Sequence, residues 1–180
     1  MRELIADLFT TLDGHAAGER SPAYFGYLGP ELERWIGDEL AKPQVILFGR
    51  VTYELLARIS EGSSEEGARR MTELPKLVVS GTLEPPLAWS NSELFNGNLA
   101  DLKAGSGDPL RCMGSLSLVR SLLSLGLVDR LRLMVFPQVL GATGREPFFA
   151  GLPDLDLELA DERVLDGRLV LLDYRPGKPS

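Results

Sequence analysis

The sequence predicts an α/β protein with a three-layer fold, in which a mixed, mostly parallel central sheet is flanked by helices and ends in an antiparallel hairpin. Three observations lead to this prediction. Short, nearly all-apolar runs such as 44–48 and 76–80 are typical of strands that are buried on both faces of a sheet. Amphipathic stretches of helical period separate these runs. The last segment alternates with period two around Asp166-Gly167, a turn dipeptide that favours a β-hairpin.

The first half of the chain alternates strands and helices. Pro30 suits the first position of a helix, and the apolar residues after it fall on one helical face. Lys42-Pro43 ends that helix, and Asp13-Gly14 is a turn dipeptide. The segments expected here are a strand at 3–9, a turn at 10–14, a loop at 15–29, a helix at 30–41, a strand at 44–48, a helix from Arg50, a short helix at 64–74 and a strand at 76–80.

The second half begins with a region rich in Gly, Pro, Asn and Ser, which predicts mostly loop over 81–110, with a helix near 94–102. The elements expected after it are a strand at 110–113, an apolar helix from Leu116 that ends at Gly126, a strand at 130–137, a loop at 138–154 and the hairpin at 155–176. Neither a repeat nor an interdomain linker interrupts the pattern. Residues 1–180 are therefore expected to form one domain.

Composition excludes several classes of function. Lys and Arg total 19 against 26 Asp and Glu, so the net charge is -7 and a nucleic-acid surface is not expected. No apolar stretch reaches about 18 residues, and Glu3 and Asp7 interrupt the N-terminal apolar run, so we expect neither a membrane span nor a secretory signal. Cys112 and His15 are the only residues of their types, which argues against a disulfide and a metal site. A reducing cytoplasm is the compartment expected.

Three segments share one pattern, in which an apolar strand is followed by glycine or serine and then by a helix or turn. In an open α/β sheet, ligands bind beyond the carboxyl ends of the strands, where helix N-termini attract anions. Hydroxyl and guanidinium groups at these ends can bind phosphate oxygens. The three segments contain Gly49, Arg50 and Thr52; Ser80 and Thr82; and Gly114, Ser115 and Ser117.

The same pattern also has a purely structural interpretation. Turns from a strand through glycine into a helix occur in most α/β proteins because the chain must reverse there. The dinucleotide fingerprint GxGxxG and the P-loop motif are both missing. The residues alone therefore leave two interpretations open, a set of ordinary turns or a site for a long polyanion such as a dinucleotide.

The order of several motifs resembles that of the dihydrofolate reductase-like superfamily, in particular the reductase domain of the riboflavin-pathway deaminase–reductase and its stand-alone relatives. The resemblance spans nearly the whole chain. It is carried by TLDG at 11–14, LFGRVTYE at 47–54, KLVVSGTL at 76–83 and the run from GSLSLVRS to LGATGREPFF at 114–149. Dihydrofolate reductases have more glycines in the cofactor loop than the Gly114-Ser115 of this chain, which makes folate a doubtful substrate.

What the resemblance implies is NADPH binding, with a small-molecule substrate. The pyrophosphate and 2′-phosphate region would be held by Gly49, Arg50 and Thr52, and the adenosine would lie beside Ser80 and Thr82. The pyrophosphate and nicotinamide ribose would lie near Gly114, Ser115, Leu116 and Ser117. The nicotinamide pocket would be lined by Ala6. The relatives commonly form homodimers, and the Leu-rich strand and hairpin near the C-terminus are the candidate contact. No metal is expected.

The function implied is hydride transfer from NADPH to a small planar heterocycle or to a ribosylamino-pyrimidine such as 5-amino-6-(5-phosphoribosylamino)uracil. Reduction of a C=N or C=O bond also needs a proton source. Asp13 is the candidate because it lies in the turn beside the expected nicotinamide pocket, although Asp13-Gly14 also suits a turn alone. Glu31 and Glu33 at a helix start are weaker candidates. The alternatives are a protein that binds NADPH without turnover, and a dihydrofolate reductase proper.

Overall fold

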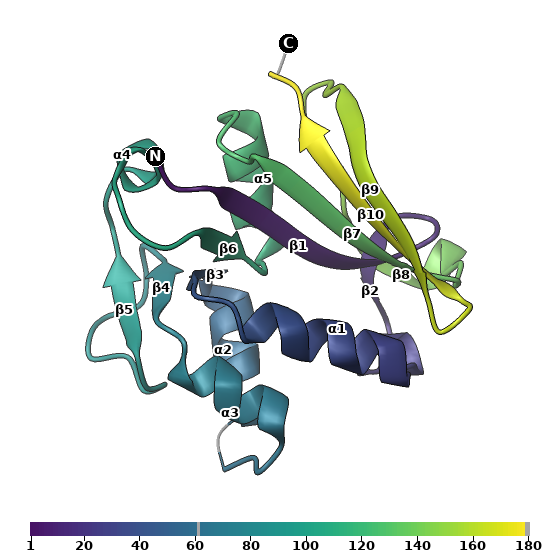
Figure 1. The fold of residues 1–180 in the computed structure, drawn as a ribbon, viewed down its shortest axis with the longest axis horizontal. Coiled ribbons are helices and arrows are strands. Elements are labelled where there is room, and N and C mark those ends of the chain that lie inside the picture. The colour runs from purple at the N-terminus through teal and green to yellow at the C-terminus, as the bar shows by residue number, and fades with distance from the viewer. Residues whose placement is uncertain (61, 179–180) are drawn as a thin grey trace.

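The computed structural model describes residues 1–60 and 62–178, and Figure 1 shows their arrangement. The strands are β1 (Leu4–Thr11), β2 (His15–Gly18), β3 (Val45–Gly49), β4 (Lys76–Val79), β5 (Ser92–Phe95), β6 (Leu110–Cys112), β7 (Arg130–Phe136), β8 (Gly144–Pro147), β9 (Leu157–Leu165) and β10 (Leu169–Pro176). The helices are α1 (Pro30–Leu40), α2 (Arg50–Ser60), α3 (Glu66–Glu73), α4 (Leu99–Ala104) and α5 (Leu116–Ser124), with 3-10 turns at Ala23–Gly26 and Gly141–Thr143.

Eight strands form one mixed sheet in the order β5-β4-β3-β6-β1-β7-β10-β9. The six strands from β5 to β7 run parallel, whereas β10 runs antiparallel to both β7 and β9. The chain moves outward from β3 to β5 and then returns to place β6 between β3 and β1. The parallel strands therefore all end at one edge of the sheet, beside the point where the strand order reverses.

Helices cover both faces of this sheet, as Figure 1 shows. Leu4, Ala6 and Leu8 of β1 point into a core that α5 closes with four buried aliphatic side chains, and α4 packs at its margin. The opposite face of the sheet packs against α1, α2 and α3. The period-two alternation of β1 thus divides its side chains between the two layers.

A buried charge network lies between α1 and the sheet. Arg132 of β7 binds the Asp7 carboxylate of β1 through Nε (2.5 Å) and Nη2 (2.7 Å), and its Nη1 binds Glu39 of α1 (2.9 Å). Arg111 of β6 also pairs with Asp7. Burial acts to raise the pKa of Glu39, but hydrogen bonds from Lys42 and Arg132 and the nearby arginine charges outweigh it, so this pKa lies below its usual value. The network therefore joins three strands and one helix through charge-assisted bonds.

Three strands lie where the sequence predicts loops or a helix, and these predictions are wrong. β2 and β8 fall in segments expected to be loops, and they pair with each other in a two-stranded sheet. β5 occupies part of the segment expected to form a helix near 94–102, because its pairing with β4 extends the main sheet. The helix there begins only at Leu99, where the Asn98 side chain accepts bonds from the amides of Ala100 (2.8 Å) and Asp101 (3.3 Å).

Within residues 1–60 and 62–178, none of the helices has the length and apolar character that crossing a bilayer requires.

Candidate functional site

A cavity of about 370 Å³ opens at the carboxyl ends of β3 and β4 and the start of α5. Side chains and backbone from α2, α4 and α5 complete its wall. The residues that line it are Gly49, Arg50, Val51, Val79, Ser80, Gly81, Thr82, Leu99, Ser115, Ser117, Leu118 and Ser121. Six of the residues predicted to bind the cofactor are among them, so the three strand ends singled out in the sequence contribute to one site.

Two glycines allow the first turns of α2 and α5 to meet at this cavity. The Gly49 amide donates to the Gly114 carbonyl (2.9 Å), and a Cβ at Gly49 would collide with the Ser115 hydroxyl. Gly114 has φ +116°, and a Cβ there would lie 2.7 Å from Thr52 Oγ1. Both helices therefore direct their N-terminal amides and positive dipole ends toward the same region, which is the arrangement that binds anions.

Hydroxyl groups and one guanidinium surround these helix ends. Ser115 Oγ and Ser117 Oγ lie 2.9 Å apart, and Ser80 Oγ accepts a bond from the Thr82 amide (3.1 Å). Arg50 Nη1 binds the Glu54 carboxylate at 3.2 Å across one helical turn, with about half of the Arg50 side chain exposed. An exposed ion pair of this kind is worth little, so a phosphate can replace Glu54 as the partner of Arg50 at low cost.

Four predicted cofactor residues do not line the cavity. Thr52, Gly114 and Leu116 lie next to lining residues in the chain, and Thr52 and Gly114 face each other. Ala6 lies within β1, between Cys112 of β6 and Leu131 of β7, and it is fully buried. Its expected place beside a nicotinamide ring stays a prediction.

Asp13 does not line the cavity, and its carboxylate is hydrogen-bonded to backbone amides of a neighbouring loop. Its Oδ2 accepts bonds from the amides of Leu140 (3.0 Å) and Gly141 (2.8 Å), and its Oδ1 accepts one from Thr11 Oγ1 (2.7 Å). The bond from the Gly141 amide, with those from Thr11, Leu140 and His15, holds the pKa of Asp13 well below its usual range. The role of proton donor stays a prediction for Asp13, and these bonds weigh against it.

Glu31, a weaker candidate for the proton source, also has a structural partner. Its carboxylate accepts a bond from the Asp166 amide in the turn of the hairpin, while Asp166 accepts a bond from the Glu31 amide (2.9 Å). This reciprocal pair lies at the N-terminus of α1 and joins that helix to the C-terminal hairpin.

Half of the residues that line the cavity are not among those that the sequence predicts to bind the cofactor. Ser121 lies one turn after Ser117 on α5, and its hydroxyl donates to the Ser117 carbonyl (3.0 Å). The four-residue spacing of these two serines was a usable signal, because such residues share a helical face. Leu99 lies in the segment where the sequence predicts a helix near 94–102, but only the fold brings that helix, α4, to the cavity.

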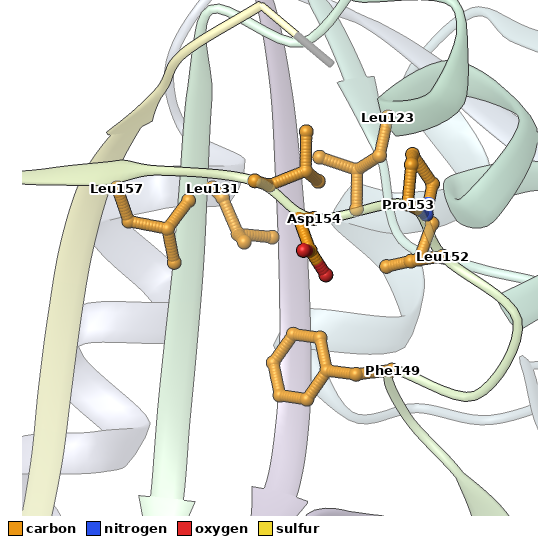
Figure 2. A pocket seen from close by; sticks show the side chains of 8 residues that line it. Leu123, Leu131, Phe149, Leu152, Pro153, Asp154 and Leu157 are labelled. Carbon is orange, nitrogen blue, oxygen red and sulfur yellow. The ribbon is translucent and has the colours of Figure 1, made fainter. Parts of the chain in front are cut away.

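A second cavity, of about 290 Å³, lies at the opposite end of α5. Figure 2 shows Leu123 of α5, Leu131 of β7 and several side chains of the 149–157 segment around it. Its lining is apolar except for Asp154. Across the described part of the chain there is also no cluster of three or more His, Cys, Asp or Glu residues placed to hold a metal ion. Of these two cavities, the first is the one lined by several hydroxyl groups and a guanidinium.

Several known proteins resemble this chain in sequence or in fold. The uncharacterised protein YyaP of Bacillus subtilis strain 168 is 26% identical over 182 residues, covering 96% of this chain and 94% of YyaP. A putative riboflavin biosynthesis protein from Shewanella sp. PV-4 superposes with a TM-score of 0.71 at 20% identity, covering 98% and 99% of the two chains. Dihydrofolate reductase from Enterococcus faecalis, complexed with NADP(H), gives a TM-score of 0.64 at 11% identity, covering 98% and 97%.

These superpositions confirm the dihydrofolate reductase-like fold that the sequence resemblance implied. The family model described as the RibD C-terminal domain matches residues 2–171. The chain therefore belongs to the RibD C-terminal domain family.

Proposed function

We propose that this protein is an NADPH-dependent reductase that transfers a hydride to a small planar heterocycle or a ribosylamino-pyrimidine such as 5-amino-6-(5-phosphoribosylamino)uracil. The observation that carries the proposal is the meeting of α2 and α5 at one cavity, through the contact between Gly49 and Gly114. Membership of the RibD C-terminal domain family supports the same class of reaction.

The residues at the cavity fit a dinucleotide phosphate. The N-terminal amides of α2 and α5, with the hydroxyls of Ser115 and Ser117, suit a diphosphate. Arg50 is the guanidinium available to a 2′-phosphate. Ser80 and Thr82 would lie beside the adenosine half, with Ala6 toward the nicotinamide.

NADPH would supply the hydride when bound, and the protein would position the two reactants and exclude water. The sequence suggests Asp13 as the donor of the accompanying proton. We propose instead that Asp13 positions the loop at 138–141 near the ends of β1 and β7, because its carboxylate is held ionised by that loop. The proton would then come from another group or from water.

The wider setting is also part of the proposal. We propose that residues 1–180 work as one domain in the cytoplasm, act on a small molecule and associate as a homodimer. The single cysteine, Cys112, is buried and can form no disulfide within the chain, as is usual for proteins of a reducing compartment.

The proposal is tested by titrating the protein with NADPH and with NADH, following nicotinamide fluorescence and calorimetric heat. Arg50→Ala should weaken NADPH binding by about 1–3 kcal/mol and leave NADH binding nearly unchanged, because only NADPH carries the 2′-phosphate. Arg69→Ala is the matched control, since Arg69 is another exposed, ion-paired arginine on a different helix. Failure of the wild-type protein to bind NADPH would refute the proposal.

Binding without turnover is the second candidate function, and the lowered pKa of Asp13 favours it because an ionised carboxylate has no proton to donate. Loss of absorbance near 340 nm with pyrimidinone, pterin or quinone-like acceptors separates the two. Tight NADPH binding with no oxidation across that panel would favour a binding protein. Tight inhibition by methotrexate-type compounds, which we do not expect, would instead indicate a dihydrofolate reductase.

A further inference from the structure

Two parts of the wall of the cavity at the ends of β3 and β4 are joined by a buried hydrogen bond. One part is the first turn of α2, which carries Arg50, and another is the β4–β5 loop (residues 80–91), which begins at Ser80. Tyr53 lies on the buried side of α2, and its hydroxyl accepts a bond from the Trp89 amide near the end of that loop (3.0 Å). Tyr53 and Trp89 are only 5% and 7% exposed, so this bond is shielded from water.

Trp89 is held by three other contacts besides this bond. Its indole nitrogen donates to Thr72 Oγ1 on α3 (2.9 Å). Its ring stacks on Phe48 of β3, with the ring centroids 6.0 Å apart. The ring centroid also lies 4.7 Å from the ammonium of Lys76, within the range of a cation–π contact. These contacts together make Trp89 a fixed anchor for the end of the β4–β5 loop.

The cation beside Trp89 is itself fixed by the end of α3. Lys76 is only 1% exposed. Its ammonium donates to the carbonyls of Met71 (2.9 Å), Thr72 (2.9 Å) and Leu74 (2.7 Å). Carbonyls at the C-terminal end of a helix lack helical amide partners and attract positive charge, so the buried cation is stable there. The Lys76 amide also donates to the Asn91 carbonyl (2.7 Å), which fixes the last residue of the β4–β5 loop at the same point.

The start of the same loop carries the groups that line the cavity. They are Ser80, Gly81 and Thr82. Ser80 Oγ accepts bonds from the amides of Thr82 and Leu83, each at 3.1 Å, so these residues form one compact turn. Leu83 and Leu87 pack against the same part of the core as Trp89. The loop thus rests on one core cluster as a unit, and its position relative to α2 depends on the anchor at Trp89.

We propose that Tyr53 is a positioning residue for the adenosine half of the cofactor. Its bond to the Trp89 amide holds the β4–β5 loop at the distance from Arg50 that a 2′-phosphorylated adenosine requires. This inference rests on the proposed function for the identity of the ligand, whereas the anchoring of the loop does not depend on it. A phenylalanine at position 53 would pack the same ring, so the contribution of the hydroxyl can be measured separately.

The experiment compares the wild-type protein with Tyr53→Phe by calorimetric titration with NADPH and with adenosine 2′,5′-bisphosphate. Without its buried acceptor the Trp89 amide favours other positions of the loop, so the arrangement that binds the nucleotide becomes less populated. The dissociation constants of both ligands should therefore rise about fivefold to tenfold. Where an acceptor substrate is found, KM for NADPH should rise in the same proportion and kcat should not change.

The loop is also followed without any ligand. Amide hydrogen exchange at Thr82 and Leu83, measured by NMR, should be faster in Tyr53→Phe than in the wild type, because the start of the loop has lost its anchor. The circular dichroism spectrum should be the same in both proteins, since the ring of residue 53 keeps its packing.

Two matched controls separate positioning from a general loss of stability. Tyr174→Phe removes a phenol hydroxyl from β10 and should change neither nucleotide affinity nor exchange in the loop. Val128→Ala removes buried volume from the core on the α5 face of the sheet. It should lower the free energy of unfolding and leave the affinity for adenosine 2′,5′-bisphosphate unchanged.

Three results would overturn the inference. They are wild-type affinity for adenosine 2′,5′-bisphosphate in Tyr53→Phe, an equal loss of affinity in Val128→Ala, and unchanged exchange at Thr82 and Leu83 in Tyr53→Phe. A different result identifies failure of the proposed function. If the wild type binds neither nucleotide but exchange is faster in Tyr53→Phe, the anchoring of the loop stands and the reductase proposal fails.

Discussion

Asp13 shows how a residue whose type suits catalysis can have a structural partner instead. The carboxylate joins the turn after β1 to the loop after β7 through two hydrogen bonds, of 3.0 and 2.8 Å, and a third bond, from Thr11 (2.7 Å), ties it to the end of β1. Its partners Leu140 and Gly141 lie 127 and 128 positions away in the chain. Because ionised carboxylates accept such bonds most strongly, the same contacts that lower the pKa also oppose donation of a proton.

Asp13→Asn should loosen this loop and leave NADPH affinity unchanged. An amide keeps one acceptor but turns its NH₂ group toward groups that need an acceptor. Hydrogen exchange should therefore accelerate at the amides of Leu140 and Gly141 in the variant. Where an acceptor substrate is found, KM should rise several-fold and the shape of the kcat–pH profile should persist.

The contrary outcome of that substitution is equally specific. Loss of turnover at unchanged KM, together with loss of one limb of the pH profile and unchanged exchange at Leu140, would restore Asp13 as the proton donor. Glu73→Gln at the end of α3 is the control for the removal of one exposed carboxylate.

At the level of elements, α1 depends on a residue from the C-terminal hairpin for its N-terminal cap. Asp166 Oδ1 accepts from the Glu31 amide (2.9 Å) and Oδ2 from the Leu32 amide (3.1 Å). Asp166 also has φ +54°, a conformation that Asp and Asn tolerate better than other side chains. One residue therefore both turns the hairpin and caps a helix.

Asp166→Ala should lower the free energy of unfolding by about 1–2 kcal/mol, because it removes the cap and strains the turn. Asp166→Asn is the matched control, since it keeps an acceptor oxygen and tolerates the same backbone angle. Urea unfolding followed by circular dichroism measures both. Equal stability of the alanine and wild-type proteins would show that α1 does not depend on this cap.

The buried network around Glu39 gives a pH dependence with a definite sign. The pKa of Glu39 is lower in the folded protein than its ordinary value, so the folded state binds fewer protons than the unfolded state as the carboxyl titrates. The stability from its contacts with Arg132 and Lys42 is therefore complete above the unfolded-state pKa of about 4.3, and it is lost as pH falls through the folded value.

Glu39→Gln tests this sign. At pH 7 the variant should be less stable by about 1–3 kcal/mol, because Arg132 loses a charged partner inside the protein. The difference in unfolding free energy should shrink as pH falls below about 4.3, since the wild-type carboxyl is then protonated as well. A difference that stays constant down to pH 3 would show that the Glu39 charge does not contribute.

At the scale of the whole molecule, the features that the sequence predicts are the helices and strands whose pattern lies within one short segment of the chain. The apolar runs at β3 and β4 and the amphipathic period of α1 lie within single segments, so their types and order follow from pattern. The meeting of the three strand ends at one cavity also follows, because parallel strands end at one edge of a sheet, whereas cofactor binding there stays a prediction. β2 and β8 do not follow from pattern, since His15 pairs with Pro147, and neither segment alternates strongly by itself. The cap of α1 by Asp166 and the bonds of Asp13 likewise depend on distant segments.

Because the cavity joins the ends of β3 and β4 to α2, α4 and α5, a bound ligand should stabilise the whole fold. At 100 times its dissociation constant, NADPH should add about 2.7 kcal/mol to the free energy of unfolding. For a chain of 180 residues each kcal/mol raises the Tm by roughly 2–4 °C, so the expected rise is about 5–11 °C. NADH at the same concentration should give a smaller rise. Gly49→Ala, whose Cβ collides with Ser115, should give none, and an equal rise in that variant would show that the meeting of α2 and α5 is not the binding site.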